Sequence, residues 1–196
     1  PINLMKLKDG DKVVSADIAL KQVVICTKNG YGLRYLTEEV PVTGLRASGV
    51  KAINLKDDFV ISSTTFNEAN YLLVVTDKNT AKRIKINDID FSSRARRGLR
   101  IIRDVKTNPY YIIYSKVINN KDNIGIITDD INYIKPTDIN ICDRYQTGSN
   151  ISNKTIEKVF VKCSESDEEI IEDVSLDSID NKMMTIDDFL GDLKID

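Results

Sequence analysis

The chain has 196 residues, of which 41% are hydrophobic and 30% charged, a composition typical of a folded protein with one sizeable core or one array of repeats. It contains no histidine, and its three cysteines, Cys26, Cys142 and Cys163, are far apart. This composition argues against a zinc site, a disulfide framework and histidine-based catalysis. No apolar run approaches the length of a membrane span, and Pro1 stands where an initiator methionine would be, so we expect a cytoplasmic fragment or processed chain.

The net charge of −2 conceals two oppositely charged parts. Residues 164–196 hold 12 acidic and 2 basic residues, whereas residues 1–163 hold 26 basic and 18 acidic ones. We therefore divide the chain into a basic domain, 1–163, and an acidic tail, 164–196. A basic body of this kind is expected to bind a polyanion.

The basic domain is built from a repeat of about fifty residues. An apolar, β-branched run is followed by a polar turn and then by a second strand containing basic residues, and the second unit repeats the first without a gap at a lag of 49 residues. The first unit contains residues 23–26, Thr27-Lys28-Asn29-Gly30 and Leu33-Arg34; the second contains residues 72–75, Thr76-Asp77-Lys78-Asn79 and Lys82-Arg83. The segment Lys28-Asn29-Gly30 supplies residues that accept the positive φ of a tight hairpin.

A third, more divergent unit follows at a lag of 50 to 52 residues, with residues 124–130, Ile139 and 147–150. Self-similarity at this period indicates a stacked or radial array of repeats. About four strands in each unit predict an all-β, propeller-like array of four-stranded blades. We count three to four blades in a domain that begins in mid-repeat, assigning residues 159–162 to one strand of a fourth.

Basic residues recur in the segment that follows the second strand of each unit. It reads Gly44-Leu45-Arg46-Ala47-Ser48-Gly49-Val50-Lys51 in the first unit and Ser92-Ser93-Arg94-Ala95-Arg96-Arg97-Gly98-Leu99-Arg100 in the second. Because the units repeat, these clusters should form a stripe on one rim, where arginine and glycine allow close approach to phosphates. The predicted DNA-binding residues are Lys28, Arg34, Arg46, Lys51, Lys78, Lys82, Arg83, Arg94, Arg96, Arg97, Arg100, Arg103, Lys106 and Arg144. In the third unit only Arg144 remains near this segment, so the stripe should be uneven.

No catalytic or metal centre is predicted. Asp57-Asp58 and Asp129-Asp130 occupy expected turns, where aspartate forms local hydrogen bonds, and Tyr110-Tyr111 and Tyr114 are expected in strands. The sequence has no phosphate-binding loop, dinucleotide fingerprint or nucleophile elbow. In the acidic tail, which we expect to be largely disordered, residues 185–193 could form a short helix that begins at Thr185.

Residues 27–33 and 40–56, together with Ser93-Arg94-Ala95-Arg96-Arg97-Gly98-Leu99, resemble the C-terminal β-pinwheel of bacterial gyrase and topoisomerase IV A subunits. The segment Asp143-Arg144-Tyr145-Gln146-Thr147-Gly148-Ser149 is similar to that of Gram-positive topoisomerase IV. The likeness covers about residues 4–162. It implies blades that exchange strands with their neighbours and a basic rim that binds and bends duplex DNA. Residues 94–100 lack the glutamine and paired glycines of the gyrase wrapping box, which weakens an assignment to gyrase.

The resemblance also implies the partners of the domain. They would be duplex DNA of any sequence, the N-terminal cleavage core of the same polypeptide and the ATPase B subunit, with no membrane. The fragment would carry no active site or cofactor of its own, while the parent enzyme would use ATP and Mg for decatenation or relaxation in the bacterial cytoplasm, at the nucleoid. Two alternatives stay open: a gyrase A wrapping domain, and a protein-interaction propeller that does not bind DNA.

Overall fold

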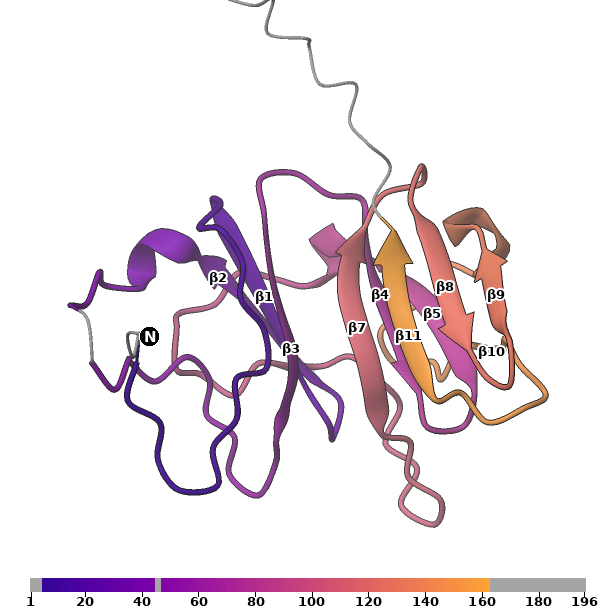
Figure 1. Cartoon of the computed structure of the whole chain (residues 1–196), viewed down its shortest axis with the longest axis horizontal. Coiled ribbons are helices and arrows are strands. Elements are labelled where there is room, and N and C mark those ends of the chain that lie inside the picture. Colours follow the sequence, from indigo (N-terminus) through magenta and orange to yellow (C-terminus); the bar gives the residue numbers. More distant parts are fainter. Residues whose placement is uncertain (1–4, 45–46, 163–196) are drawn as a thin grey trace, which may run out of the picture. The chain divides into compact units, whose positions relative to one another are not determined.

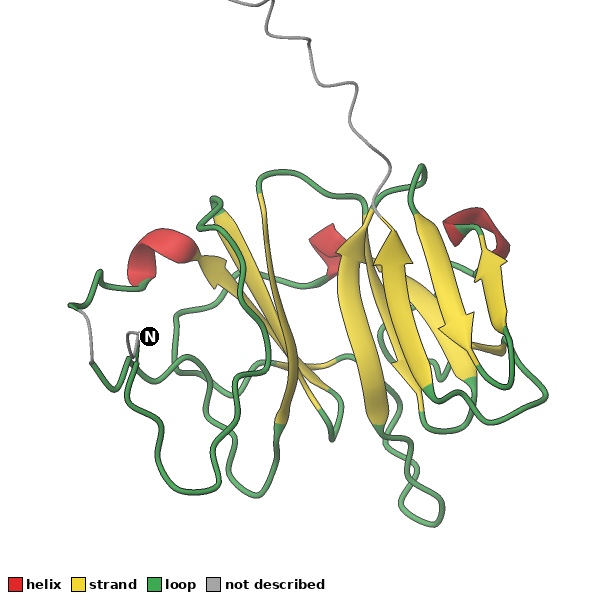
Figure 2. Cartoon of the chain, viewed as in Figure 1, coloured by secondary structure: helices red, strands yellow, loops and turns green. Residues whose placement is uncertain are grey.

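The computed structural model describes residues 5–44 and 47–162, and it shows antiparallel sheets joined by loops and three single-turn 3-10 helices (Figures 1 and 2). The predicted tail helix at 185–193 lies outside the described residues. The strands are β1 Gln22–Thr27, β2 Tyr31–Leu36, β3 Val60–Phe66, β4 Tyr71–Thr76, β5 Thr80–Lys85, β6 Leu99–Arg100, β7 Ile112–Ile118, β8 Asn123–Ile127, β9 Ile131–Ile134, β10 Ser149–Asn150 and β11 Lys158–Lys162. The 3-10 helices are η1 Thr37–Glu39, η2 Ile86–Asp88 and η3 Pro136–Asp138.

Each repeat forms a β-hairpin from its apolar run and the strand that follows. In the first unit β1 pairs with β2 so that Ile25 lies opposite Leu33, and the turn between them uses Gly30 with φ +87°. The same turn in the second unit places Asn79 at φ +56°, a conformation that asparagine tolerates better than most residues. The hairpins predicted from the two polar turns are confirmed.

The sheets exchange strands along the chain. Blade 1 has the order β3-β1-β2-β6, and blade 2 has the order β10-β5-β4-β7. In both blades the two-residue outer strand comes from the next repeat: β6 pairs with β2 through Tyr31 and Arg100, and β10 pairs with β5 through Thr80 and Asn150. The expected exchange of strands between neighbouring blades is therefore present. Below, the outer edge of a blade means the edge that carries this exchanged strand.

Blade 3 has the order β11-β8-β9. The prediction that residues 159–162 begin a fourth blade is wrong, because β11 pairs with β8 through Val159 and Ile126 and completes the third sheet on its inner side. The corresponding strands β3 and β7 pair with β1 and β4 in the same way. In the chain, the inner strand of a blade follows the short strand that is exchanged with the preceding blade, as β11 follows β10. The repeat spacing alone does not show whether such a strand completes one blade or begins the next.

The core lies between the blades. Leu72 and Val74 of β4 pack with Val24 and Cys26 of β1, on the side of blade 1. The alternate residues of the same strand, Leu73 and Val75, join a second cluster with β8 on the side of blade 3. Since both faces of β4 are buried, its sequence is continuously apolar rather than alternating. Each such buried side chain contributes about 1.5–3 kcal/mol, so the contacts between blades hold the array together.

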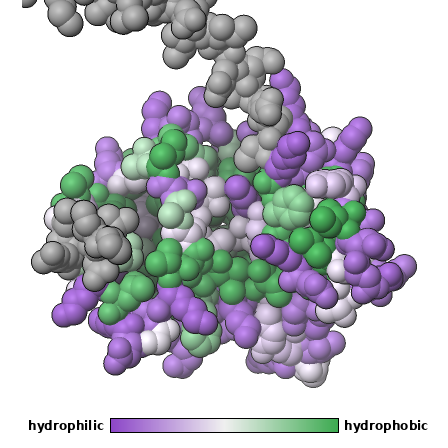
Figure 3. All heavy atoms as spheres, in the orientation of Figure 1, coloured by the Kyte–Doolittle hydropathy of each residue, from purple (hydrophilic) through white to green (hydrophobic). Residues whose placement is uncertain are grey.

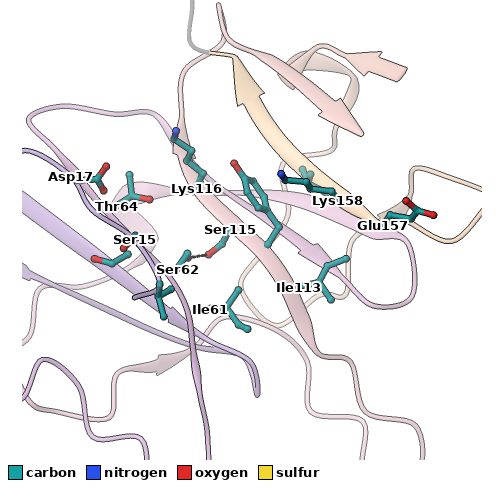
Figure 4. Close-up of a pocket in the computed structure, with 14 residues that line it drawn as sticks. Ser15, Asp17, Ile61, Ser62, Thr64, Ile113, Ser115, Lys116, Glu157 and Lys158 are labelled. Carbon is teal, nitrogen blue, oxygen red and sulfur yellow. Dashed lines mark hydrogen bonds between the residues drawn. The ribbon is translucent and has the colours of Figure 1, made fainter. Parts of the chain in front are cut away.

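The inner strands β3, β7 and β11 border a cavity of about 410 Å³, shown in Figure 4. The hydroxyls of Ser62 in β3 and Ser115 in β7 face each other there and share a hydrogen bond that joins blades 1 and 2. Both also contact the thiol of Cys26, whose pKa is raised to about 11 by burial. This cysteine is therefore a protonated core residue and not a nucleophile.

Candidate nucleic-acid interface

Two of the three segments that carry the predicted basic stripe form corners beside the outer edges of blades 1 and 2. We name residues 44–51 corner 1, residues 92–100 corner 2 and residues 142–150 corner 3. Corners 2 and 3 have the same succession of turn, bend and two-residue strand. Corner 2 lies against β2 of blade 1 and corner 3 against β5 of blade 2. The repetition of the corners at successive blades is thus a property of the fold.

One glycine in each corner has a positive φ, at Gly49 (+75°), Gly98 (+84°) and Gly148 (+85°). A Cβ on Gly98 would lie 2.3 Å from the carbonyl oxygen of Gly32, and one on Gly148 would lie 2.4 Å from that of Ala81. The exchanged strand can therefore approach the preceding hairpin only with glycine at this position. Among the described residues, no heavy atom other than those of its chain neighbours lies within 4 Å of the same point at Gly49.

Three of the predicted DNA-binding residues are buried, which corrects their assignment to the surface. The guanidinium of Arg34 donates to the carbonyl oxygens of Ile86 at 2.8 Å and Ile89 at 3.2 Å. Arg83 repeats this contact one blade later by donating to the carbonyl oxygen of Ile139 at 2.8 Å. Both arginines attach a hairpin to the turn of the next repeat, and this structural role explains why they recur at the repeat spacing.

Lys82 is the third of these residues, and it holds corner 3 in place. Its side chain is fully buried, and its ammonium group donates to the carbonyl oxygens of Asp143 (3.0 Å), Arg144 (2.9 Å) and Gln146 (2.7 Å). Burial lowers the pKa of Lys82 to about 8. Three backbone carbonyls satisfy all three donors, so this group is not available to a phosphate.

Hydrogen bonds join corner 2 to Lys51 of corner 1 and to the residues on either side of that corner. The guanidinium of Arg94 donates to the carbonyl oxygens of Glu39 at 2.9 Å and Lys51 at 2.6 Å. Backbone bonds run from Ala95 to the carbonyl oxygen of Ala52 and from Asn54 to that of Arg96. Arg94 is therefore a linking residue, and the exposed side chains of Lys51 and Arg96 belong to one continuous surface. Arg46, also predicted for this stripe, lies outside the described residues.

Corner 2 continues into two arginines that contact one tyrosine ring. The guanidinium carbon of Arg97 lies 4.2 Å from the ring centroid of Tyr31, and that of Arg100 lies 5.1 Å from it. Arg100 also donates to the carbonyl oxygen of Asn29 at 3.1 Å and forms a 3.2 Å ion pair with Asp104. Arg97 is exposed and makes no hydrogen bond or ion pair within the described residues, so its donors face solvent.

The basic surface extends to the hairpin turns and to the loop before β7. Arg103 and Lys106 in that loop are exposed. Lys78 donates to the carbonyl oxygen of Asn108 at 2.7 Å and lies 4.1 Å from the ring centroid of Tyr110, while Lys28 lies 5.2 Å from that of Tyr111. Two of the tyrosines expected in strands therefore precede β7 and pack against lysines. These side chains lie at the hairpin-turn end of blades 1 and 2.

The positive charge decreases toward blade 3. Superposing corner 3 on corner 2 by sequence places Gln146, Thr147 and Asn150 at the positions of Arg96, Arg97 and Arg100, and only Arg144 matches a basic residue, Arg94. Arg144 lies 4.8 Å from the ring of Tyr145. The turn of the third hairpin carries Asp129, which forms a 2.7 Å ion pair with Lys154.

In the other aspartate pair, Asp58 accepts hydrogen bonds from the backbone N–H of its neighbour Phe59 and from that of Asn29 in the turn of the first hairpin, so one of its bonds is local and the other joins two segments. Among the described residues, no group of three histidine, cysteine or acidic side chains could hold a metal ion, and no helix is long and apolar enough to cross a membrane. Apolar residues form a band across the face seen in Figure 3, with hydrophilic residues around it. Sequence reasoning missed Tyr31, because its arginine partners lie more than sixty residues away and leave no local signal.

Blades with exchanged outer strands and a glycine-hinged, arginine-bearing corner define a β-pinwheel. A family model described as "DNA gyrase C-terminal domain, beta-propeller" matches residues 2–19, 21–65 and 70–119, which is more than half of the chain. The chain belongs to this family.

The curated relatives include the A subunit of DNA topoisomerase 4 from Streptococcus pneumoniae, 32% identical over 180 residues, covering 87% of this chain and 22% of the relative. Its counterpart from Bacillus subtilis is 31% identical over 150 residues, covering 74% of this chain and 19% of the relative. The chain thus spans about a fifth of the length of these relatives.

Among solved structures, the C-terminal domain of DNA topoisomerase IV has a TM-score of 0.76 at 32% identity, covering 81% of this chain and 52% of that one. A DNA gyrase A C-terminal domain has a TM-score of 0.70 at 19% identity, covering 80% of this chain and 56% of that one, and this likeness shows the fold alone.

Proposed function

We propose that this chain is the DNA-binding and DNA-bending part of a topoisomerase IV-type A subunit, which presents duplex DNA to a cleavage core during ATP-dependent decatenation or relaxation. One observation carries the proposal: corner 2 displays Arg96, Arg97 and Arg100 on the outer edge of blade 1, and hydrogen bonds join it to corner 1 with Lys51. The arginine donors that face solvent form a surface suited to the phosphates of a duplex of any sequence.

Bending of duplex DNA requires a binding surface that carries several cations. Bending a 20–30 bp segment costs on the order of 1–6 kcal/mol, so more than one phosphate contact is needed to offset it. Nine of the predicted basic residues keep side chains at or near the surface without being fully engaged by the protein: Lys28, Lys51, Lys78, Arg96, Arg97, Arg100, Arg103, Lys106 and Arg144. We propose these nine as the DNA-contacting set, with the strongest contribution from corner 2.

Two observations favour a topoisomerase IV-type domain over a gyrase wrapping domain. The relatives described above are topoisomerase 4 A subunits, and residues 94–100 lack the glutamine and paired glycines of the gyrase box. The proposed partners are therefore duplex DNA, the N-terminal core of the same polypeptide and the ATPase B subunit, at the bacterial nucleoid in the cytoplasm. We assign ATP and Mg to the rest of that enzyme and no cofactor to this chain.

The test is a binding titration with two duplexes of unrelated sequence over a series of salt concentrations. The variant Arg96→Ala/Arg97→Ala/Arg100→Ala/Arg103→Ala leaves the linking residue Arg94 intact. Its matched control removes the same charge from exposed lysines at the opposite ends of the strands, as Lys21→Ala/Lys85→Ala/Lys121→Ala/Lys135→Ala.

We expect the arginine variant to weaken binding to both duplexes and to reduce the slope of log affinity against log salt by about three to four. The lysine variant should change the slope by less than about one. Equal losses in the two variants would show nonspecific attraction to net charge. Salt-independent binding, or none, by the wild-type chain would favour the protein-interaction propeller instead.

A further inference from the structure

We propose that Tyr31 is a positioning residue that holds the guanidinium groups of Arg97 and Arg100 ready for phosphate, an inference that rests on the proposed DNA-binding function. The strand exchange brings the three residues together: β6 pairs Arg100 with Tyr31, although 69 residues separate them in the sequence. The ring then lies 4.2 Å and 5.1 Å from the two guanidinium carbons.

Comparison of the two exchanged strands supports a link between the ring and the arginines. In blade 2 the residue that pairs with the exchanged strand is Thr80, opposite Asn150. Corner 3 there has Thr147 where corner 2 has Arg97, and Thr80 donates its hydroxyl hydrogen bond to the carbonyl oxygen of Thr147 at 2.7 Å. The aromatic ring is thus present at the blade whose corner has arginines at positions 97 and 100, and a threonine replaces it at the blade whose corner has Thr147 and Asn150 at the equivalent positions.

The packing of Tyr31 differs from that of a core aromatic residue. Its side chain is half-buried at the end of β2 nearest the hairpin turn, and it belongs to none of the apolar clusters formed by the described residues. By contrast Tyr35, four residues later in the same strand, is 2% exposed and part of the core of blade 1. The Tyr31 ring therefore packs against the two arginines and is not part of the apolar core.

The ring has a physical reason to favour DNA binding. Arginine loses considerable rotamer freedom when it is fixed on a ligand, and a guanidinium stacked on an aromatic face has lost part of that freedom beforehand. Two cations held at one ring also repel each other, and Asp104 pairs with Arg100 only. A phosphate between or beside the two guanidinium groups would offset this repulsion, so the pair of arginines favours binding of an anion.

Binding to the duplex provides the first test. Tyr31→Leu removes the ring, Tyr31→Phe keeps it, and Tyr133→Leu removes an exposed tyrosine from blade 3 as a control. We expect Tyr31→Leu to weaken duplex binding about tenfold at low salt and to lower the salt slope, while the other two variants bind like wild type.

In an Arg97→Ala/Arg100→Ala background, Tyr31→Leu should have no further effect. An equal loss of affinity in both backgrounds, or no loss in the wild-type background, would overturn the proposal, since the ring would then act independently of the arginines.

A second measurement needs no DNA, and it separates this inference from the function on which it rests. The aromatic face should move the side-chain Nε–H resonances of Arg97 and Arg100 upfield, and Tyr31→Leu should abolish the displacement, whereas Tyr31→Phe should retain it. If the wild-type chain binds no duplex but shows this displacement, the proposed function fails and the positioning of the arginines stands. If Tyr31→Leu leaves both resonances in place, the positioning role is wrong whatever the chain binds.

Discussion

The backbone of Gly98 lies against the carbonyl oxygen of Gly32, so closely that a Cβ on Gly98 would be 2.3 Å from that oxygen. The contact joins the corner of one repeat to the hairpin of the preceding one. It therefore fixes where the exchanged strand β6 begins, and with it the position of Arg97 and Arg100. The same relationship recurs between Gly148 and Ala81.

Gly98→Ala should destabilise the protein far more than Gly49→Ala. Both glycines have a positive φ, which costs alanine about 1 kcal/mol, but only Gly98 has a backbone atom in the way. We expect a loss of about 1 kcal/mol for Gly49→Ala and about 2–4 kcal/mol for Gly98→Ala, measured by urea unfolding. Equal losses would mean that φ alone requires glycine at the corners.

Substitution of Arg34 should lower the stability of the protein, whereas substitution of Arg97 should weaken its binding to DNA. Removing Arg34 leaves the carbonyl oxygen of Ile89 without this donor and that of Ile86 with only the backbone N–H of Ile89, so Arg34→Ala should cost about 2–4 kcal/mol of stability. Arg97→Ala should change stability by less than about 0.5 kcal/mol and lower the salt slope of binding by about one.

The comparison between Arg34 and Arg97 requires urea unfolding and duplex titration of both variants, with the titration done well below the unfolding midpoint. A reduced salt slope of DNA binding by the folded Arg34→Ala variant would show that Arg34 contacts DNA and contradict its purely structural role.

Stability should rise with pH above about 8 because of Lys82. The pKa of this lysine is about 8 in the folded chain against an ordinary value of 10.5, so the unfolded chain binds more protons between these values. Below pH 8 the lysine is charged in both states and its contribution is constant. The free energy of unfolding of the wild type, relative to Lys82→Met, should therefore increase as pH is raised from about 8 toward 10.5.

Urea unfolding of wild type and Lys82→Met across this range measures the pH effect, since other titrating groups are common to both chains. A difference between the two proteins that stays flat or falls with pH would show that the three carbonyl contacts of Lys82, rather than its burial, dominate its pKa.

Corner 3 should gain DNA affinity if it receives the side chains of corner 2. The variant Gln146→Arg/Thr147→Arg/Asn150→Arg, with Thr80→Tyr to supply a ring, places three cations at positions equivalent to those of corner 2. We expect the salt slope to increase by about two to three, because the corner lies on the outer edge of the next blade. A duplex titration measures this gain.

The matched control for corner 3 adds the same charge at the opposite ends of the strands, as Asn87→Arg/Asn123→Arg/Thr137→Arg. It should increase the slope much less. If the salt slope of duplex binding increases equally in both variants, added cations strengthen binding wherever they lie and the corners are not the DNA-binding surface.

The repeat and its hairpins could be predicted from the sequence because local signals, such as Asn29-Gly30 after an apolar run, determine them. The recurrence of Gly49, Gly98 and Gly148 also marked the corners correctly. The exposure of basic residues could not be predicted in the same way. Arg34 and Arg83 recur at the repeat spacing because they bind backbone carbonyls of the next repeat, and a recurring arginine on the surface produces the same pattern in the sequence.

Strand exchange is the physical reason for the other differences between the predictions from the sequence and the structure. It pairs residues about seventy positions apart, so neither the partnership of Tyr31 with Arg100 nor the burial of Lys82 beneath corner 3 has a local signature. It also places β11 in the third blade, whereas the repeat spacing predicts that residues 159–162 begin a fourth. Periodicity shows that units repeat, but the partner of each strand depends on how the chain crosses between them.

The most direct test of the DNA-binding surface is to follow the backbone amide resonances of the chain while a duplex of about 20 bp is added at low salt. We predict that the resonances of residues 96–103 shift, those of corner 3 shift less, and those of residues 119–122 and 135–138 at the opposite strand ends stay in place. Shifts concentrated at those opposite ends, with residues 96–103 unchanged, would contradict the proposed surface.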